Sequence, residues 1–144
     1  MELAFLPLQE GDEEMIFALC RDLILTYEDP RDIDLDKAIQ WTRRKIHAKN
    51  AEYRRVTLDG DVAGYFRLFP REDVLELDDL HILKDFQRRG LADAVVRHCI
   101  AQGKPLELYV FNENHAALAL YRKHGFRLLR TESTTRSVLR REVL

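Results

Sequence analysis

Residues 80–92 combine charged and small residues in an order that suits a phosphate group. Arg88 and Arg89 stand directly before Gly90, where an apolar helical pattern begins. The start of a helix presents backbone N–H groups that have no partner inside the helix, and the helix dipole adds partial positive charge there. Because glycine has no side chain to block an approaching ligand, phosphate oxygens fit such a turn. This stretch therefore predicts a turn that binds the pyrophosphate of a nucleotide-like cofactor.

Three acidic residues and a histidine lie on the strand that leads into this turn, namely Glu76, Asp78, Asp79 and His81. Alternation along a strand puts Glu76 and Asp78 on one face. Asp79 and His81 then fall on the other face, unless a bulge intervenes. A carboxylate can accept a proton directly or through a water, so this strand is a candidate for general-base chemistry. The alternative is a cation-binding or solvated face without proton transfer.

A second string, residues 114–126, follows the next expected strand. Its pattern residues are Asn114, Ala117, Leu120, Tyr121, Gly125 and Phe126. With this string and the turn at residues 80–92, set in a strand–helix–strand–helix order, the chain resembles the GNAT superfamily of acyl-CoA-dependent N-acetyltransferases. The chain departs from that pattern at Lys84, where many members have proline, and at Ala92, where others have glycine. A small residue at position 92 still fits close to phosphate.

The resemblance implies acetyl-CoA as the cofactor. The backbone N–H groups that would hold its pyrophosphate belong to Gln87, Arg88, Arg89, Gly90, Leu91 and Ala92. Backbone groups of Leu80 and Ile82 would pair with the pantetheine arm as an added strand would. Arg88 and Arg89 would add charge or reach the 3′-phosphate, or else form a solvated helix start. Asn114 would contact the arm from the other side, a role compatible with capping the helix that it begins.

The resemblance also implies a catalytic pair. Tyr121 would contact the cofactor and act as general acid, because amine attack on the thioester expels a thiolate that a phenol can protonate. The alternative for Tyr121 is a core residue of an amphipathic helix. Glu76 lies four residues before Leu80, where some family members carry a catalytic glutamate, and we expect it to be the general base. Asp78, His81 or a water remain open as bases, although a lone histidine in a strand is more often structural.

The acceptor of the acetyl group should meet the first two helices and the strands that face them. In this region Glu28, Asp29 and Asp78 are expected to form a negative rim. Such a rim favours a cationic acceptor, which could be a polyamine, an aminoglycoside-like amine, or a lysine or N-terminal amine of a peptide. An acidic loop that is merely solvated is the alternative.

The length and composition of the chain limit its number of domains and its possible partners. The chain has 144 residues, which predicts one domain over residues 1–144. Its formal net charge of −2 does not favour nucleic acid or an anionic membrane, and no apolar run approaches the length of a membrane helix. Cys20 and Cys99 fall in apolar helical patterns, and their spacing supports neither a disulfide nor a zinc site. We expect two buried thiols in a reduced, cytoplasmic protein, either monomer or homodimer.

The order of expected elements completes the prediction. Strands are expected near residues 3–8, 53–58, 62–69, 74–83, 105–111, 126–131 and 137–143, with four helices between them. Asp59-Gly60 between two apolar runs indicates a tight hairpin. We expect an α/β, GNAT-like fold with a mixed, mostly antiparallel central sheet. Its function would be direct acetyl transfer to a primary amine in a ternary complex, because no cysteine is placed for a covalent intermediate. A non-catalytic, CoA-binding regulatory or interaction module is the alternative.

Overall fold

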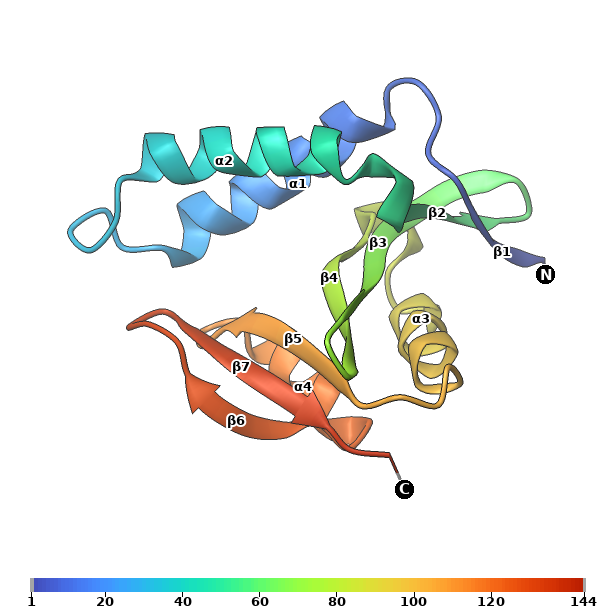
Figure 1. Cartoon of the computed structure of the whole chain (residues 1–144). Coiled ribbons are helices and arrows are strands. Elements are labelled where there is room, and N and C mark those ends of the chain that lie inside the picture. Colours follow the sequence, from blue (N-terminus) through green and yellow to red (C-terminus); the bar gives the residue numbers. More distant parts are fainter. Residues whose placement is uncertain (1, 144) are drawn as a thin grey trace.

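A seven-stranded sheet organises the chain in the computed structural model, which describes residues 2–143 (Figure 1). The strands are β1 (Leu3–Leu6), β2 (Tyr53–Leu58), β3 (Asp61–Arg71), β4 (Val74–Ile82), β5 (Leu106–Phe111), β6 (Arg127–Thr131) and β7 (Arg136–Arg141). The helices are α1 (Asp12–Tyr27), α2 (Leu35–Ala48), α3 (Leu91–Ile100) and α4 (His115–Lys123), with short 3-10 turns at Asn50–Glu52 and Lys84–Phe86. This order of elements confirms the prediction from the sequence.

The sheet has the strand order β1-β2-β3-β4-β5-β7-β6. Neighbouring strands pair antiparallel everywhere except at β4 and β5, which are parallel. The predicted mixed, mostly antiparallel sheet with four helices is therefore confirmed. Asp59 and Gly60 both have positive φ, as the predicted tight turn between β2 and β3 requires.

The two central strands, β4 and β5, diverge after a short region of pairing. Only Leu75 with Leu106 and Glu76 with Glu107 are in register. Beyond Glu76, residues 77–82 of β4 therefore leave their backbone groups on that side without a neighbouring strand. Figure 1 shows β4 running away from β5 toward the helices at the top. The split opens a space between the two halves of the sheet, and an extended ligand can pair with its edge.

Helices cover both faces of the sheet. α1 and α2 lie side by side over one face and bury Ile16 and Ile46 against Tyr53 and Tyr65. α3 and α4 cover the other face, where their apolar residues join a larger core from the strands; this core includes Val56, Phe66, Val95, Leu108, Tyr121 and Phe126. None of the helices within residues 2–143 is long and apolar enough to cross a membrane.

One glycine permits a close approach between strands. Gly64 of β3 pairs with Ile82 of β4. A Cβ atom at Gly64 would lie 2.2 Å from the carbonyl oxygen of His81, well inside contact distance. Only glycine therefore lets β3 run this close to the last residues of β4.

Candidate active site

A β-bulge shapes the strand that carries the acidic residues. Tyr65 of β3 pairs with His81 of β4, and Arg67 pairs with Asp78. One residue of β3 therefore lies opposite two residues of β4, which is a β-bulge in β4. Asp79 has a φ of 51°, an uncommon value for a residue other than glycine. The bulge turns Asp79 to the same side as Asp78, because both carboxylates contact Lys45. Simple alternation alone would put them on opposite faces, and the bulge is the exception that the sequence analysis allowed for.

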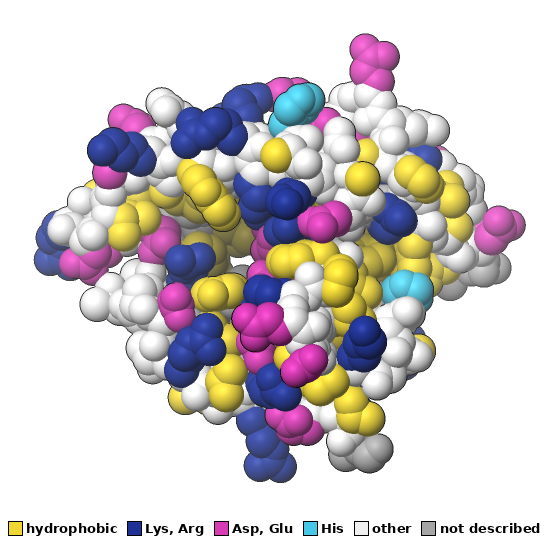
Figure 2. Space-filling view, viewed as in Figure 1, with side chains coloured by type: hydrophobic (Ala, Val, Ile, Leu, Met, Phe, Trp, Pro, Cys, Tyr) yellow, Lys and Arg dark blue, Asp and Glu magenta, His cyan; other side chains and the backbone are white. Residues whose placement is uncertain are grey.

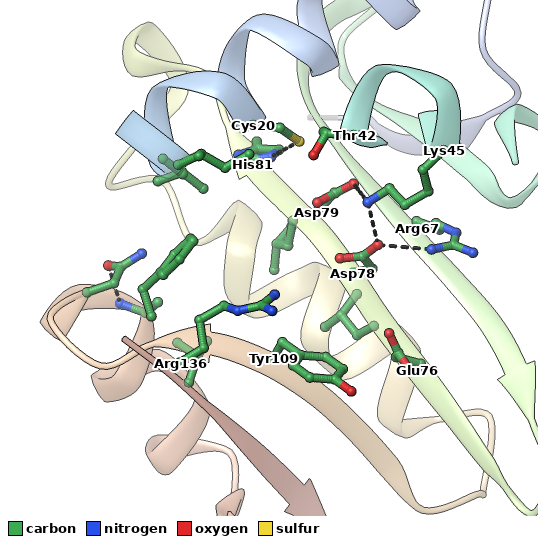
Figure 3. A pocket seen from close by; sticks show the side chains of 18 of the residues that line it. Cys20, Thr42, Lys45, Arg67, Glu76, Asp78, Asp79, His81, Tyr109 and Arg136 are labelled. Atoms are coloured by element: carbon green, nitrogen blue, oxygen red, sulfur yellow. Dashed lines mark hydrogen bonds and ion pairs between the residues drawn. The ribbon is translucent and has the colours of Figure 1, made fainter. Parts of the chain in front are cut away.

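Lys45 of α2 joins these two carboxylates (Figure 3). Its Nζ lies 2.9 Å from Oδ2 of Asp78 and 2.8 Å from Oδ2 of Asp79. Arg67 donates to Asp78 Oδ2 over 3.0 Å, and the hydroxyl of Tyr53 donates to Asp79 Oδ2 over 2.5 Å. Burial, followed by the negative charge of Asp79, raises the pKa of Asp78 above its ordinary value. Asp78 is thus the carboxylate of the pair that takes up a proton more readily.

Glu76 lies on the same strand but has a different environment. Arg71 donates from Nε to Glu76 over 2.9 Å and from Nη2 to Glu107 over 2.8 Å. Arg140 of β7 also contacts Glu107, at 2.6 Å. These ion pairs lie where β4 and β5 meet, so the carboxylate of Glu76 is bound to the closed end of the split.

Tyr121 occupies the facing wall of the site. It lies on α4, and its ring contacts Phe126 edge-on with centroids 5.5 Å apart. Burial, and then the nearby groups of Cys99 and Asp78, raise the pKa of Tyr121 above its ordinary value. The phenol therefore keeps its proton at neutral pH. Asn114 caps the same helix, since its Oδ1 accepts a hydrogen bond from the N–H of Ala117 at 3.2 Å.

These side chains share one cavity of about 710 Å³ between the α1–α2 pair and the diverging strands. The predicted site residues on its wall are Glu76, Asp78, Leu80, His81, Asn114 and Tyr121. Figure 2 shows the opening in the middle of the molecule, with basic, acidic and hydrophobic side chains around it. The structure thus brings together the predicted acid, all the predicted side-chain bases and the open edge of β4.

The predicted phosphate turn lies outside this cavity, at the end of β4. Gly90 has a φ of 76° and precedes the first residue of α3, and no side chain caps that helix. A Cβ at Gly90 would meet nothing within 4 Å, so the approach to the first-turn N–H groups is open. The side chain of Gln87 donates one hydrogen bond to the carbonyl of Ile82 over 3.1 Å, which holds the turn against the end of β4. Arg89 lies over the ring of Phe86, 5.3 Å from its centroid.

Two residues that were expected to bind the acceptor do not line the cavity. Glu28 accepts a hydrogen bond from the hydroxyl of Thr135 and lies 3.9 Å from Arg136. Asp29 forms an exposed ion pair with Arg31 at 2.8 Å. Of the predicted negative rim, only Asp78 faces the cavity. The physical reason is that the loop after β6 approaches the end of α1 and engages Glu28 itself.

Several cavity residues escaped the sequence reasoning. Among them are Cys20, Lys45, Tyr109 and Arg136. The guanidinium of Arg136 points into the cavity above Tyr109, and its Nε is buried without a hydrogen-bond partner among residues 2–143 (Figure 3). These residues come from segments far apart in the chain, so no local motif could have shown that they meet.

Comparison with known proteins identifies the fold and the family. Residues 16–126 match the model of the acetyltransferase (GNAT) family. This chain belongs to the GNAT acetyltransferase family. No curated protein sequence matches it.

Solved structures of acetyltransferases have the same fold. PaiA N-acetyltransferase from Thermoplasma acidophilum in complex with coenzyme A is 18% identical, with a TM-score of 0.67 and 99% of each chain covered. An acetyltransferase from Thermus thermophilus is 20% identical with a TM-score of 0.73, covering 99% of this chain and 98% of that one. The ribosomal-protein-S18-alanine N-acetyltransferase from Escherichia coli is 19% identical with a TM-score of 0.66, covering 99% and 94%.

As a GNAT acetyltransferase, the protein takes its acetyl group from acetyl-CoA, and its residues fit that cofactor. The uncapped start of α3 behind Gly90 suits the pyrophosphate. The unpaired edge of β4 beyond Glu76 suits the amides of the pantetheine arm. The arm would then reach the cavity that Asn114 and Tyr121 line. When bound, acetyl-CoA supplies an activated acetyl thioester.

Proposed function

We propose that this acetyltransferase transfers acetyl directly to a primary amine while both substrates are bound. The observation that supports this proposal best is that a protonated phenol, Tyr121, and a carboxylate of raised pKa, Asp78, line one cavity at the open end of the β4–β5 split. With a base and an acid on the same cavity, the base can remove the proton of the amine and the acid can protonate the leaving thiolate within one ternary complex.

Asp78 is the base that we propose, in preference to Glu76. An ammonium group cannot attack a thioester until it loses a proton, and a carboxylate whose pKa is raised accepts that proton more readily. Lys45 and Arg67 both bind Oδ2 of Asp78, which leaves Oδ1 for the amine or for a water that relays the proton. Glu76 is held by Arg71 at the closed end of the split, farther along β4 from the bulge. His81 is half-buried, and this burial lowers its pKa.

Tyr121 is the general acid of the proposal. The collapse of the tetrahedral adduct breaks the carbon–sulfur bond and leaves a CoA thiolate. Tyr121 keeps its proton until that moment because burial disfavours its phenolate. The proton passes from the phenol to the sulfur, the second proton leaves the amine nitrogen and restores the phenol, and Asp78 releases the first amine proton to solvent.

The charges on the cavity wall support an acceptor that carries an anionic group as well as its amine. The acidic groups Glu76, Asp78 and Asp79 all have basic partners, so none of these three carboxylates is left unpaired for a polycation. Nε of Arg136, in contrast, has no hydrogen-bonded partner among residues 2–143, and Glu28, which is 3.9 Å away, is only a distant ion-pair partner. An arginine in this setting binds a carboxylate with charge-assisted hydrogen bonds. We therefore propose a zwitterionic amine, such as an amino acid or a short peptide. Among the expected acceptors, this favours the N-terminal amine of a peptide over a polyamine or an aminoglycoside-like amine.

A panel of amines tests the proposal. Release of free CoA thiol from acetyl-CoA would be measured with amino acids, dipeptides and polyamines, each amino acid beside the amine that lacks its carboxylate. We expect turnover with primary amines and a preference for the carboxylate-bearing member of each pair. Arg136→Met should remove that preference by raising KM for the carboxylate-bearing acceptors alone. Best turnover with polyamines would contradict the acceptor class, and tight CoA binding without any turnover would support a non-catalytic CoA-binding module instead.

A further inference from the structure

Three potential metal ligands meet on the cavity wall although they come from separate parts of the chain. Sγ of Cys20, on α1, lies 3.5 Å from Nε2 of His81, on β4 (Figure 3). One ligand atom from each of Cys20, Asp79 and His81 lies within 4.8 Å of the other two. All three residues line the cavity. The bulge in β4 places this cluster, because it brings both Asp79 and His81 to the side of the sheet on which Asp78 lies.

The separation of the sulfur and the nitrogen suits one metal ion. Zinc binds cysteine sulfur at about 2.3 Å and histidine nitrogen at about 2.0–2.1 Å, so two such ligands of a tetrahedral ion lie about 3.5 Å apart. The distance from Cys20 Sγ to His81 Nε2 matches that edge of a tetrahedron. Thiolate, imidazole and carboxylate together form a donor set for zinc rather than for magnesium or calcium, which prefer oxygen ligands.

The carboxylate of Asp79 is held through a single oxygen. Lys45 and Tyr53 both bind its Oδ2, at 2.8 and 2.5 Å. These contacts leave Oδ1 for a ligand while they fix the plane of the carboxylate. Hydrogen bonds of this kind behind a metal ligand orient it and tune its affinity. Lys45 can keep its position when Asp79 binds an ion, because the ammonium group of Lys45 also pairs with the carboxylate of Asp78.

The charges around the cluster also favour a dication. The ion-pair network consists of the cations Lys45 and Arg67 and the carboxylates Asp78, Asp79 and Glu52. It therefore has one negative charge in excess, and a thiolate at Cys20 would add a second. A divalent ion balances both.

We propose that Cys20, Asp79 and His81 form a binding site for a divalent zinc-class ion on the wall of the acceptor cavity. The three side chains provide three of four tetrahedral positions, and the fourth faces the cavity. The ion replaces the proton of the Cys20 thiol on binding. This site does not depend on acetyl transfer, and its test does not measure acetyl transfer.

Metal binding to the purified full chain tests the site. After treatment with a chelator, the protein would be titrated with Zn²⁺ by calorimetry and with Co²⁺ by absorption spectroscopy. We expect one Zn²⁺ per chain, and a thiolate-to-cobalt charge-transfer band with the intense visible bands of tetrahedral Co²⁺. Cys20→Ser should weaken Zn²⁺ binding at least about tenfold and remove the charge-transfer band. His81→Gln should weaken binding similarly.

Two variants serve as matched controls. Cys99→Ser removes the other buried cysteine, which lies in the core on the far face of the sheet, and should leave both titrations unchanged. His47→Asn removes a surface histidine that contacts Glu13, and it should also bind Zn²⁺ like the wild type. Circular dichroism would confirm that each variant is folded. Absence of stoichiometric Zn²⁺ binding, or equal binding by folded Cys20→Ser, would overturn the site.

Discussion

Nε2 of His124 lies 2.8 Å from Oδ1 of Asp93, and this contact joins the end of α4 to the first turn of α3. Lys123 contacts the same oxygen at 2.7 Å. The turn that is proposed to hold the pyrophosphate and the helix that carries Tyr121 are therefore attached to each other directly. The distance between the pyrophosphate turn and the helix of Tyr121 is therefore fixed before a cofactor that spans them binds.

The first prediction concerns this attachment. Asp93→Ala should weaken CoA binding several-fold and lower the free energy of unfolding by about 1 kcal/mol, as expected for a partly exposed ion pair. Hydrogen bonds from Lys123 and His124 hold the pKa of Asp93 below its ordinary value. Its contribution to stability is therefore present at neutral pH, and it is lost as the pH falls through the folded-state pKa. Denaturant unfolding at neutral and acidic pH would measure the difference.

The control for that prediction is Asp73→Ala, which removes an exposed carboxylate from the β3–β4 turn. It should change neither CoA affinity nor stability by more than about 0.5 kcal/mol. An Asp93→Ala protein that binds CoA as tightly as the wild type would show that the contact between α3 and α4 does not position the cofactor site.

A second prediction tests the general acid. Tyr121→Phe should lower kcat by about 100-fold or more and leave the affinity for CoA nearly unchanged, because only the proton donor is lost. Steady-state kinetics and calorimetry with CoA would separate the two effects. Tyr109→Phe removes a hydroxyl from another tyrosine on the cavity wall and should retain most activity. Equal turnover by Tyr121→Phe and the wild type would remove Tyr121 from the mechanism.

The assignment of the base gives a third prediction. Asp78→Asn should lower kcat/KM by about 100-fold, whereas Glu76→Gln should have a much smaller effect. Because the pKa of Asp78 is raised by burial and by Asp79, kcat/KM of the wild type should rise with pH through the weakly acidic range as Asp78 loses its proton. Asp78→Asn should lack this rise, and Glu76→Gln should keep it. The opposite pattern in the pH profiles would assign the base to Glu76.

A fourth prediction uses two glycines at the two ends of α3. Gly90 and Gly103 have φ values of 76° and 78°, and each has open space where a Cβ would lie. A glutamate at either position meets similar backbone strain, about 1–2 kcal/mol. Only Gly90→Glu should abolish the thermal stabilisation by CoA, since its carboxylate would lie where the pyrophosphate binds. If Gly90→Glu were stabilised by CoA as fully as Gly103→Glu, the pyrophosphate would bind elsewhere.

The elements of the fold could be predicted because their signals are local. Helix spacing, the Asp59-Gly60 turn and the cap residues depend on neighbours within a few positions. Asp34 caps α2 through a hydrogen bond from the N–H of Lys37, and Asn114 caps α4, as their residue types indicate. The turn at Gly90 and the helix of Tyr121 were predictable for the same reason.

The chemistry of the cavity could not be predicted because it depends on contacts between distant segments. A bulge adds one residue to β4 and cannot be recognised from the alternation of acidic residues alone, so the face on which Asp79 lies stayed open. Lys45 comes from the polar face of α2 and could only be described as a solvated cation. Glu28 belongs to an acidic link, yet its partner Thr135 follows it by 107 residues.

Gly64 has a consequence for protein engineering. Its backbone lies so close to the carbonyl of His81 that any side chain would displace β4 beside the bulge. The position therefore belongs to the active site although it contributes no chemical group. A mutant library that aims to change acceptor choice by varying the cavity wall should keep glycine at position 64. Variants at this position would lose activity through a shifted strand rather than through an altered contact with substrate.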